Sequence, residues 1–271
     1  MKKPLLCLFI LLLLPLVACD RPGPIDSTGA PTTEYFNTTH RSDLTNNAGG
    51  TADSSAELQQ PTQHSERYLP GVPVEDVIRY FNEVCLNAEY VISGNATLVQ
   101  KWTEPIQYVV YGEPTAEDRF TLSAFTEQLN GISGFPGIHE TQNPSQANLR
   151  IHFCTREELI SLMGGGAQYE NMDGAVTFWY NNNQIYDAII CYRTDLDQTL
   201  RNSVILEEIY NGLGPIQDSS LRPDSIIYQG FSTPQRLTEM DVLLLQLLYH
   251  PEITCGMNAA QCEAVIRRLY Y

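Results

Sequence analysis

Leu206-Glu207-Glu208-Ile209-Tyr210-Asn211-Gly212-Leu213-Gly214 is the stretch from which the rest of this 271-residue chain is best interpreted. On a helix of 3.6 residues per turn, Glu207, Glu208 and Asn211 fall within a sector of roughly 100 degrees. The pattern predicts a helix over residues 198–213. The other broad side of this helix carries the apolar side chains expected of a core-facing surface; these are Ile205, Leu206, Ile209, Tyr210 and Leu213.

The polar side of this helix has two interpretations. Leu200 and Val204 lie in the same sector as the two glutamates. A fully solvated face does not usually carry such side chains, although single exposed apolar residues are common. The sector therefore either lines a groove or forms the wet face of an ordinary amphipathic helix.

Helical and extended periodicities alternate on both sides of this helix. The expected fold class is α+β, with a mostly antiparallel or mixed sheet and helices late in the chain. Alternating apolar residues predict strands over 106–112 and 148–154, and a hairpin of 174–180 and 185–192 across three asparagines. Apolar residues at helical spacing, with Thr238 as an N-cap before one of the segments, predict the further helices; these span 73–86, 115–129, 155 to about 164, 237–249 and 258–269.

The central helix resembles the zinc-binding helix of the metzincin (zincin) clan of peptidases. That clan carries His-Glu-x-x-His-x-x-Gly-x-x-His, which puts two imidazoles on one helical face and the general-base Glu beside the first. Here Glu207 and Asn211 stand at the two helical ligand positions, Glu208 at the base position and Gly214 at the glycine. The glutamate and the glycine of the motif are therefore kept, whereas its two helical histidines are replaced.

Later segments continue this resemblance. Gln217, with Asp218 next to it, stands at the third ligand position. Residues 224–228 look like the Met-turn region of metzincins, with Ile227 at the methionine position. Residues 237–249 are similar to the C-terminal helix of matrix-metalloprotease-like domains, which carries Leu-Thr-x-x-Asp and then Gln-x-Leu-Tyr. The resemblance implies a metzincin-like domain with a mixed sheet, an active-site-type helix and C-terminal helices.

The chain also looks like an uncharacterised bacterial family described only as a domain of unknown function. That family has a Glu-Glu-x-x-Gln/Asn core followed by Leu-Gly, and later Leu-Tyr and Gly-Met. The corresponding residues here are Glu207-Glu208, Leu248-Tyr249 and Gly256-Met257. The combined resemblance covers roughly residues 100–260.

The donor atoms at the three ligand positions do not suit zinc. Zinc prefers His or Cys and needs three protein ligands beside an open position. Oxygen donors from Glu207, Asn211 and Gln217 or Asp218 suit calcium or magnesium better, and they are too few for firm binding. No cofactor and no metal are therefore expected, with zinc as the minor alternative. No two histidines are four residues apart; they are His40, His64, His139, His152 and His250.

The amino terminus has the features of a bacterial lipoprotein signal. Lys2 and Lys3 precede a ten-residue apolar run over 5–14, which is too short to span a bilayer. Leu16-Val17-Ala18-Cys19 follows and resembles a lipobox. The resemblance implies a signal peptide over 1–18 and acylation, including palmitate, at Cys19, and so a lipid anchor at the periplasmic face of the inner or outer membrane. The alternative is an ordinary secretory signal cut nearby.

Composition predicts an exported domain on a tether. Residues 19–68 are rich in Ser, Thr, Pro, Asn and Gly and predict a disordered tether, whereas 69–271 shows the continuous apolar periodicity of one globular domain. Without residues 1–18 the chain keeps 14 basic and 32 acidic residues, a formal net charge of −18. Phosphate backbones repel such a surface, so nucleic-acid binding is excluded as a function class.

Five cysteines remain after Cys7 and Cys19 are set aside. Cys255 and Cys262 flank a short turn before the last predicted helix, and an exported compartment permits disulfides, so we expect these two to pair. No Cys-x-x-Cys motif occurs, so a thiol-based zinc site is not indicated. The other three, of which two at most can pair with each other, are Cys85, Cys154 and Cys191.

Three function classes remain open. The favoured one is a non-catalytic envelope lipoprotein that uses a peptidase-like fold to bind or assemble with an envelope protein or peptide, because the edge strand of a zincin sheet can take an extended peptide by strand addition. The alternative is a metal-dependent peptidase or hydrolase with a rebuilt site in which Glu208 is the general base. The third is a structural lipoprotein in which the likeness concerns packing only.

Overall fold

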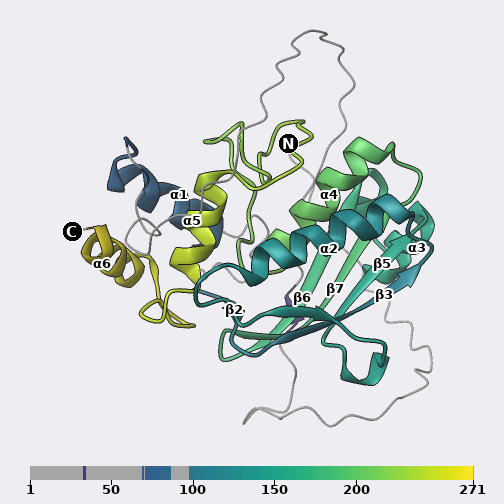
Figure 1. Ribbon diagram of the computed structural model, residues 1–271, viewed down its shortest axis with the longest axis horizontal. Coiled ribbons are helices and arrows are strands. Elements are labelled where there is room, and N and C mark those ends of the chain that lie inside the picture. Colours follow the sequence, from purple (N-terminus) through teal and green to yellow (C-terminus); the bar gives the residue numbers. More distant parts are fainter. Residues whose placement is uncertain (1–32, 35–68, 70, 87–97, 271) are drawn as a thin grey trace, which may run out of the picture. The chain divides into compact units, whose positions relative to one another are not determined.

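The computed structural model describes residues 33–34, 69, 71–86 and 98–270, all of them in the unit that spans residues 32–271. Figure 1 shows the chain, with its elements labelled where there is room. The strands are β1 (Thr33–Glu34), β2 (Lys101–Trp102), β3 (Ile106–Gly112), β4 (Ile138–Glu140), β5 (Leu149–Cys154), β6 (Gly174–Asn181) and β7 (Gln184–Arg193). The helices are α1 (Val74–Leu86), α2 (Ala116–Asn130), α3 (Arg156–Leu162), α4 (Gln198–Asn211), α5 (Glu239–Leu248) and α6 (Ala259–Tyr270), and the 3-10 turns are η1 (Pro144–Gln146) and η2 (Ala167–Asn171).

The sheet is mixed, and parallel pairs dominate it. Its order is β1-β6-β7-β5-β3-β4, with β2 also pairing with β7. The pairs β3–β4, β3–β5, β5–β7 and β2–β7 are parallel, whereas β6–β7 and β1–β6 are antiparallel. The expectation of a mixed sheet is confirmed, and its mostly antiparallel alternative is wrong. The reason is that helix α2 crosses over between β3 and β4, and crossover connections of this kind produce parallel neighbours.

Local sequence signals set the ends of the helices as expected. Thr115, Thr155 and Thr238 are N-caps, each in a capping box with an acidic side chain three residues on. These boxes satisfy backbone N–H groups that would otherwise have no partner in the first turn. The predicted hairpin is also present, and Asn182 and Asn183 in its turn have φ of 50° and 62°. Asparagine tolerates this left-handed region, which a two-residue hairpin turn requires.

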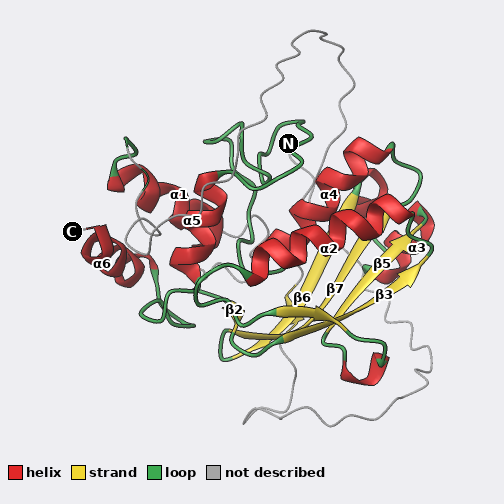
Figure 2. Cartoon of the chain, in the orientation of Figure 1, coloured by secondary structure: helices red, strands yellow, loops and turns green. Residues whose placement is uncertain are grey.

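The two faces of the sheet carry different layers. Helices α2 and α4 pack together, and α4 lies against β6 and β7 (Figure 2). On this face Leu149, Ile151 and Phe153 of β5 belong to the main hydrophobic core. The intervening Arg150, His152 and Cys154 point to the opposite face because successive strand residues alternate. Helix α3 and turn η2 cover part of that opposite face and form a second, smaller core.

Strand β1 lies within the segment for which the sequence predicted a disordered tether. Thr33 and Glu34 pair antiparallel with Trp179 and Phe178 of β6. The predicted signal peptide and Cys19 lie outside the described residues. In the part of the chain that the structure describes, none of the helices has the length and apolar character to cross a bilayer.

Candidate functional site

Helix α4 carries the predicted site, and neighbouring elements hold it at both ends. Asp197 caps its first turn by accepting a hydrogen bond from the backbone N–H of Leu200. At the other end, Nε1 of Trp102 in β2 donates to the carbonyl oxygen of Gly212 at 2.9 Å. Between these ends the hydroxyl of Tyr210 donates to the backbone oxygen of Asp241 in α5 at 2.8 Å. The sheet therefore packs on one side of α4 and α5 on another.

The acidic sector of α4 is buried. Glu207, Glu208 and Asn211 are each 1% exposed, and eleven of the fourteen helix residues are buried. The interpretation of this sector as a wet face is therefore wrong. The helical wheel could not show this burial, because it identifies which residues share a side but not what packs against that side.

Glu208 fills a space that the first residue of β6 leaves open. A Cβ atom on Gly174 would lie 2.7 Å from Cγ of Glu208 and 2.5 Å from Cγ1 of Val204. The absence of a side chain at Gly174 is what lets α4 approach the sheet here. The carboxyl group also affects Tyr192 of β7. Burial raises the pKa of Tyr192, and the nearby charge of Glu208 raises this pKa further.

We expect Gly174→Ala to lower the free energy of unfolding by about 1–3 kcal/mol, because the added methyl group overpacks a filled space against Val204 and Glu208. Urea unfolding measures the change. Gly131→Ala is the matched control, since Gly131 has an ordinary φ of −80° and the added Cβ meets only one atom, at 3.3 Å. That control is expected to change stability by no more than about 1 kcal/mol. Equal effects at the two positions would show that the close approach of α4 carries no packing cost.

The predicted turn after α4 is present and has a strict steric requirement. Gly214 has φ of +124°, and a Cβ there would lie 2.4 Å from the backbone oxygen of Gln100. Gln217 is half-buried, and its backbone N–H donates to the oxygen of Val84 at 3.2 Å. Asp218 beside it is buried. The chain after Gly214 thus runs along α1 instead of into solvent.

The segments that the resemblance singled out meet one another. The backbone N–H of Ser219 donates to the oxygen of Ile227 at 2.9 Å. Oγ of Ser225 donates to Oδ1 of Asp241 at 2.5 Å, and the hydroxyl of Tyr80 donates to Ser225 at 2.9 Å. Burial raises the pKa of Asp241, and the hydrogen bonds from Ser225 and Thr238 oppose this shift. Residues 217–219, residues 224–228 and α5 are therefore held together through the buried side chains of Ser225 and Asp241.

The donors around α4 do not fit a zinc ion. The ligand positions hold Glu207, Asn211 and Gln217 or Asp218, which bring carboxylate and amide groups but no imidazole or thiol. Among the described residues, no three His, Cys, Asp or Glu side chains gather as they would around a metal. His152 lies on the opposite face of the sheet, stacked on Tyr111 with 4.7 Å between ring centroids. No step of zinc chemistry can be assigned to these residues.

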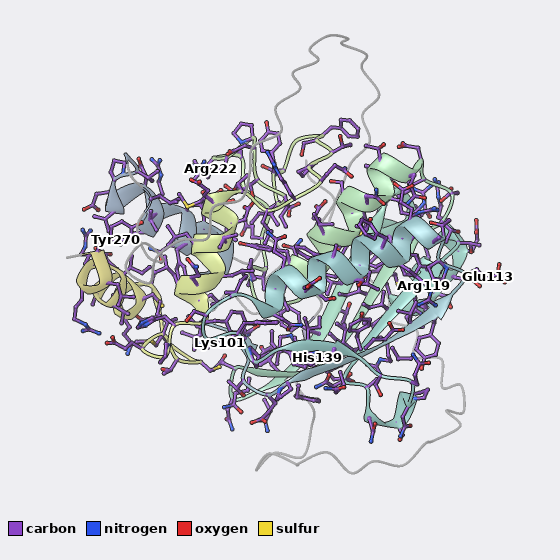
Figure 3. All side chains as sticks on the ribbon, in the orientation of Figure 1. Lys101, Glu113, Arg119, His139, Arg222 and Tyr270 are labelled. Carbon is purple, nitrogen blue, oxygen red and sulfur yellow. The ribbon has the colours of Figure 1, made fainter. Side chains whose placement is uncertain are left out.

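No sequence pattern indicates a role for Lys101 and Trp102 of β2, although Trp102 contacts the end of α4. Strand β2 is two residues long, too short for a pattern of alternation. Lys101 is 7% exposed, and its Nζ donates to the backbone oxygens of Leu248 at 2.8 Å and Ile253 at 2.5 Å. Figure 3 labels this lysine, and burial lowers its pKa. Lys101 thus joins β2 to the end of α5 and to the turn that follows it.

The disulfide predicted from spacing is not formed in the structure. Cys255 and Cys262 are both free thiols. Cys262 is buried in α6, whereas the half-buried Cys255 points its thiol at the backbone oxygen of Lys101, 3.8 Å away. The contact with Lys101 turns Cys255 toward β2.

Comparison with known proteins gives the chain a family. A search of curated proteins gives no match. A family model described as a protein of unknown function, DUF2927, matches residues 74–268, from the start of α1 into the last turn of α6. This match confirms the expected likeness to a domain of unknown function. Because it covers well over half of the sequence, the chain belongs to the DUF2927 family.

Proposed function

We propose that this protein is a lipid-anchored envelope protein whose domain binds an extended segment of another envelope protein along the outer edge of β6, without cleaving it. The observation that carries the proposal is the antiparallel pairing of β1 with β6. Thr33 is paired with Trp179 and Glu34 with Phe178. Two residues from a distant part of the chain have thus added as a strand to this edge.

The position of β6 favours strand addition. Strand β6 is eight residues long, and its other edge is occupied by β7. An edge strand presents backbone N–H and C=O groups that an incoming extended peptide can pair with. Main-chain hydrogen bonds then provide affinity, and side chains along the edge provide selectivity.

The arrangement around α4 supports a metzincin-like frame for this binding site. Strand β6, which runs antiparallel to both β7 and β1, lies beside α4. The segments that resemble the Met-turn region and the C-terminal helix meet through Ser225 and Asp241. In the proposal, the domain keeps the peptide-binding edge strand of a metzincin-like fold and has lost the ability to hydrolyse a peptide.

The residues at the ligand and base positions support the non-catalytic part of the proposal. A general base must come within hydrogen-bond reach of the proton it removes. Glu208 is 1% exposed and is packed against Gly174. Glu207 and Asn211 replace the imidazoles that would activate a water molecule. No observation favours the alternative in which Glu208 serves a rebuilt hydrolase.

The sequence supports the anchor and the class of partner. The lipobox-like segment ending at Cys19 would place the protein on an envelope membrane. The mature charge of −18, from 14 basic and 32 acidic residues, disfavours phosphate-rich partners. An extended protein segment is compatible with the negative charge of the domain and can pair with the edge of β6.

A peptide made from this chain's own residues 29–38 tests the edge directly, because it contains both residues of β1. The full-length protein and its Thr33→Pro/Glu34→Pro variant are compared by fluorescence anisotropy with the labelled peptide. In an antiparallel pair only one of two consecutive residues points its N–H at the partner strand, so proline at both positions removes that donor whichever residue provides it. Since a tethered strand acts at an effective concentration of about millimolar, the variant should bind the peptide at least about tenfold more tightly than the unmodified protein.

The site of binding and the fate of the peptide complete the test. If the peptide continues the register of Thr33 with Trp179 and Glu34 with Phe178 by one residue, its position 35 would lie beside Thr177, so a photoreactive residue there should cross-link within β6. A peptide with proline at positions 33 and 34 is the control and should not bind. Equal binding to both forms of the protein, or cross-links outside β6, would contradict the proposal. Cleavage of the peptide would instead favour the hydrolase alternative.

A further inference from the structure

The smaller core on the opposite face of the sheet is rich in sulfur. It contains two thiols and two thioethers, and all four side chains are buried. None of them belongs to the α4 site or to the β6 edge. The sulfur-bearing residues are Cys154, Met163, Met172 and Cys191, and Leu159, Tyr169 and Ala175 complete the cluster.

The two thiols come from neighbouring parallel strands and meet. In the register of β5 and β7, Cys154 is opposite Arg193, and Cys191 is opposite His152. The two cysteines are therefore diagonal neighbours on the same face of the sheet. Their side chains are hydrogen-bonded to each other, and this bond together with burial raises the pKa of Cys191. Both thiols are free.

A diagonal pair of this kind suits a bridging ion better than a disulfide. With strands about 4.8 Å apart and a rise of about 3.3 Å per residue, the two Cα atoms are about 8 Å apart. A disulfide needs Cα atoms no more than about 7 Å apart. An ion held between two sulfurs tolerates the longer separation, because each sulfur bonds to the ion and not to the other sulfur.

We infer that Cys154 and Cys191 bind a soft monovalent ion, Cu(I), between their sulfurs, with Met163 or Met172 as a thioether donor. Thiolate and thioether ligands select Cu(I), and the cluster contains two thiols and two thioethers. Zinc in a structural site would need four ligands, and no group of three His, Cys, Asp or Glu side chains able to hold a metal exists among the described residues. Burial keeps competing water away from the ion.

The chemistry of binding balances without an oxidant. Each thiol loses its proton to solvent, two S–Cu bonds form, and copper enters and remains as Cu(I). Met163 already uses its sulfur as an acceptor, since Oγ1 of Thr177 donates to Sδ at 3.4 Å. That lone pair would turn from the hydroxyl to the ion. The thiol of Cys154, which now donates to the oxygen of Tyr192 at 3.6 Å, would give up this bond on deprotonation.

The test is a Cu(I) titration of the full-length mature protein in detergent under anaerobic conditions. A chromophoric Cu(I) chelator competes for the ion, and we expect one Cu(I) per chain. Since even changes outside the ligand shell weaken metal binding 10–100-fold, Cys154→Ser/Cys191→Ser should weaken it by more than about 100-fold. The matched control is Cys255→Ser/Cys262→Ser. It also removes two thiols, but both lie outside the smaller core, so the affinity for Cu(I) should stay unchanged.

X-ray absorption at the copper edge of the unmodified protein provides a readout that does not depend on how the variants fold. A first shell containing only sulfur is expected, and Met163→Leu should remove one sulfur from it if Met163 is the thioether donor. A first shell with nitrogen or oxygen atoms would overturn the inference. So would loss of binding in the Cys255/Cys262 variant instead of the Cys154/Cys191 variant, or an unmodified protein that does not compete with the chelator.

Discussion

Cys19→Ser is expected to move the protein from the membrane fraction into the soluble fraction of the cell envelope, and to abolish labelling by a palmitate analogue. The physical reason is that, in the proposed anchor, acyl chains on Cys19 hold the protein on the membrane. Two or more chains anchor a protein stably, whereas a polypeptide of net charge −18 has no attraction to anionic headgroups. Fractionation with immunoblotting measures the distribution, and mass spectrometry of the mature N-terminus measures the lipid.

Cys7→Ser is the matched control for this experiment. Cys7 lies in the apolar run of the same predicted signal peptide, so its loss should change neither export nor acylation. Separation of the inner and outer membranes on a density gradient then identifies the membrane that carries the anchor. A Cys19→Ser protein that stays with the membrane after a high-pH wash would contradict the lipid anchor and point to a protein contact as the attachment.

Helices and caps could be predicted from the sequence because their signals are local. The capping boxes that begin at Thr115, Thr155 and Thr238 lie within four residues each, and the structure places helix starts there. The hairpin turn at Asn182 and Asn183 is local in the same sense. The parallel pairing of β3 with β4 and β5 was not predictable in this way, because it joins residues that are distant in sequence.

The candidate site was only partly predictable for a related reason. The sequence placed Glu207, Glu208 and Asn211 on one side of a helix, and the structure keeps them there. Their burial depends on what the fold packs against α4, including α5 through Tyr210 and β6 through Gly174. Likewise, β1 lies in a stretch without apolar periodicity, and its pairing depends on the edge that β6 presents.

Arg201→Ala is expected to produce a large loss of stability, because it removes one partner of a buried ion pair that holds α4 to α2. Nε of Arg201 lies 2.8 Å from Oδ1 of Asp118, and the two side chains are 8% and 1% exposed. Arg201 also donates to the oxygen of Thr194 at 2.6 Å. Removing one member of such a pair leaves a buried charge and costs about 3–5 kcal/mol. At about 2–4 °C per kcal/mol for a domain of this size, Tm should fall by about 10 °C.

The reason for the large effect is that Asp118 cannot leave its position. Its Oδ2 accepts the backbone N–H of Thr115 at 2.7 Å in the capping box of α2, so the carboxylate stays buried when the guanidinium is removed. Asp118→Asn on the Arg201→Ala background removes the charge while an amide oxygen can still cap the helix, and it should restore part of the lost stability.

Arg79→Ala is the control, since the pair of Arg79 with Asp76 is exposed and contributes less than about 1 kcal/mol. If Arg201→Ala cost no more than this control, the buried pair would not be what holds α4 against α2. The position of Glu207 and Glu208 would then have to depend on the contacts of α4 with the sheet and with α5.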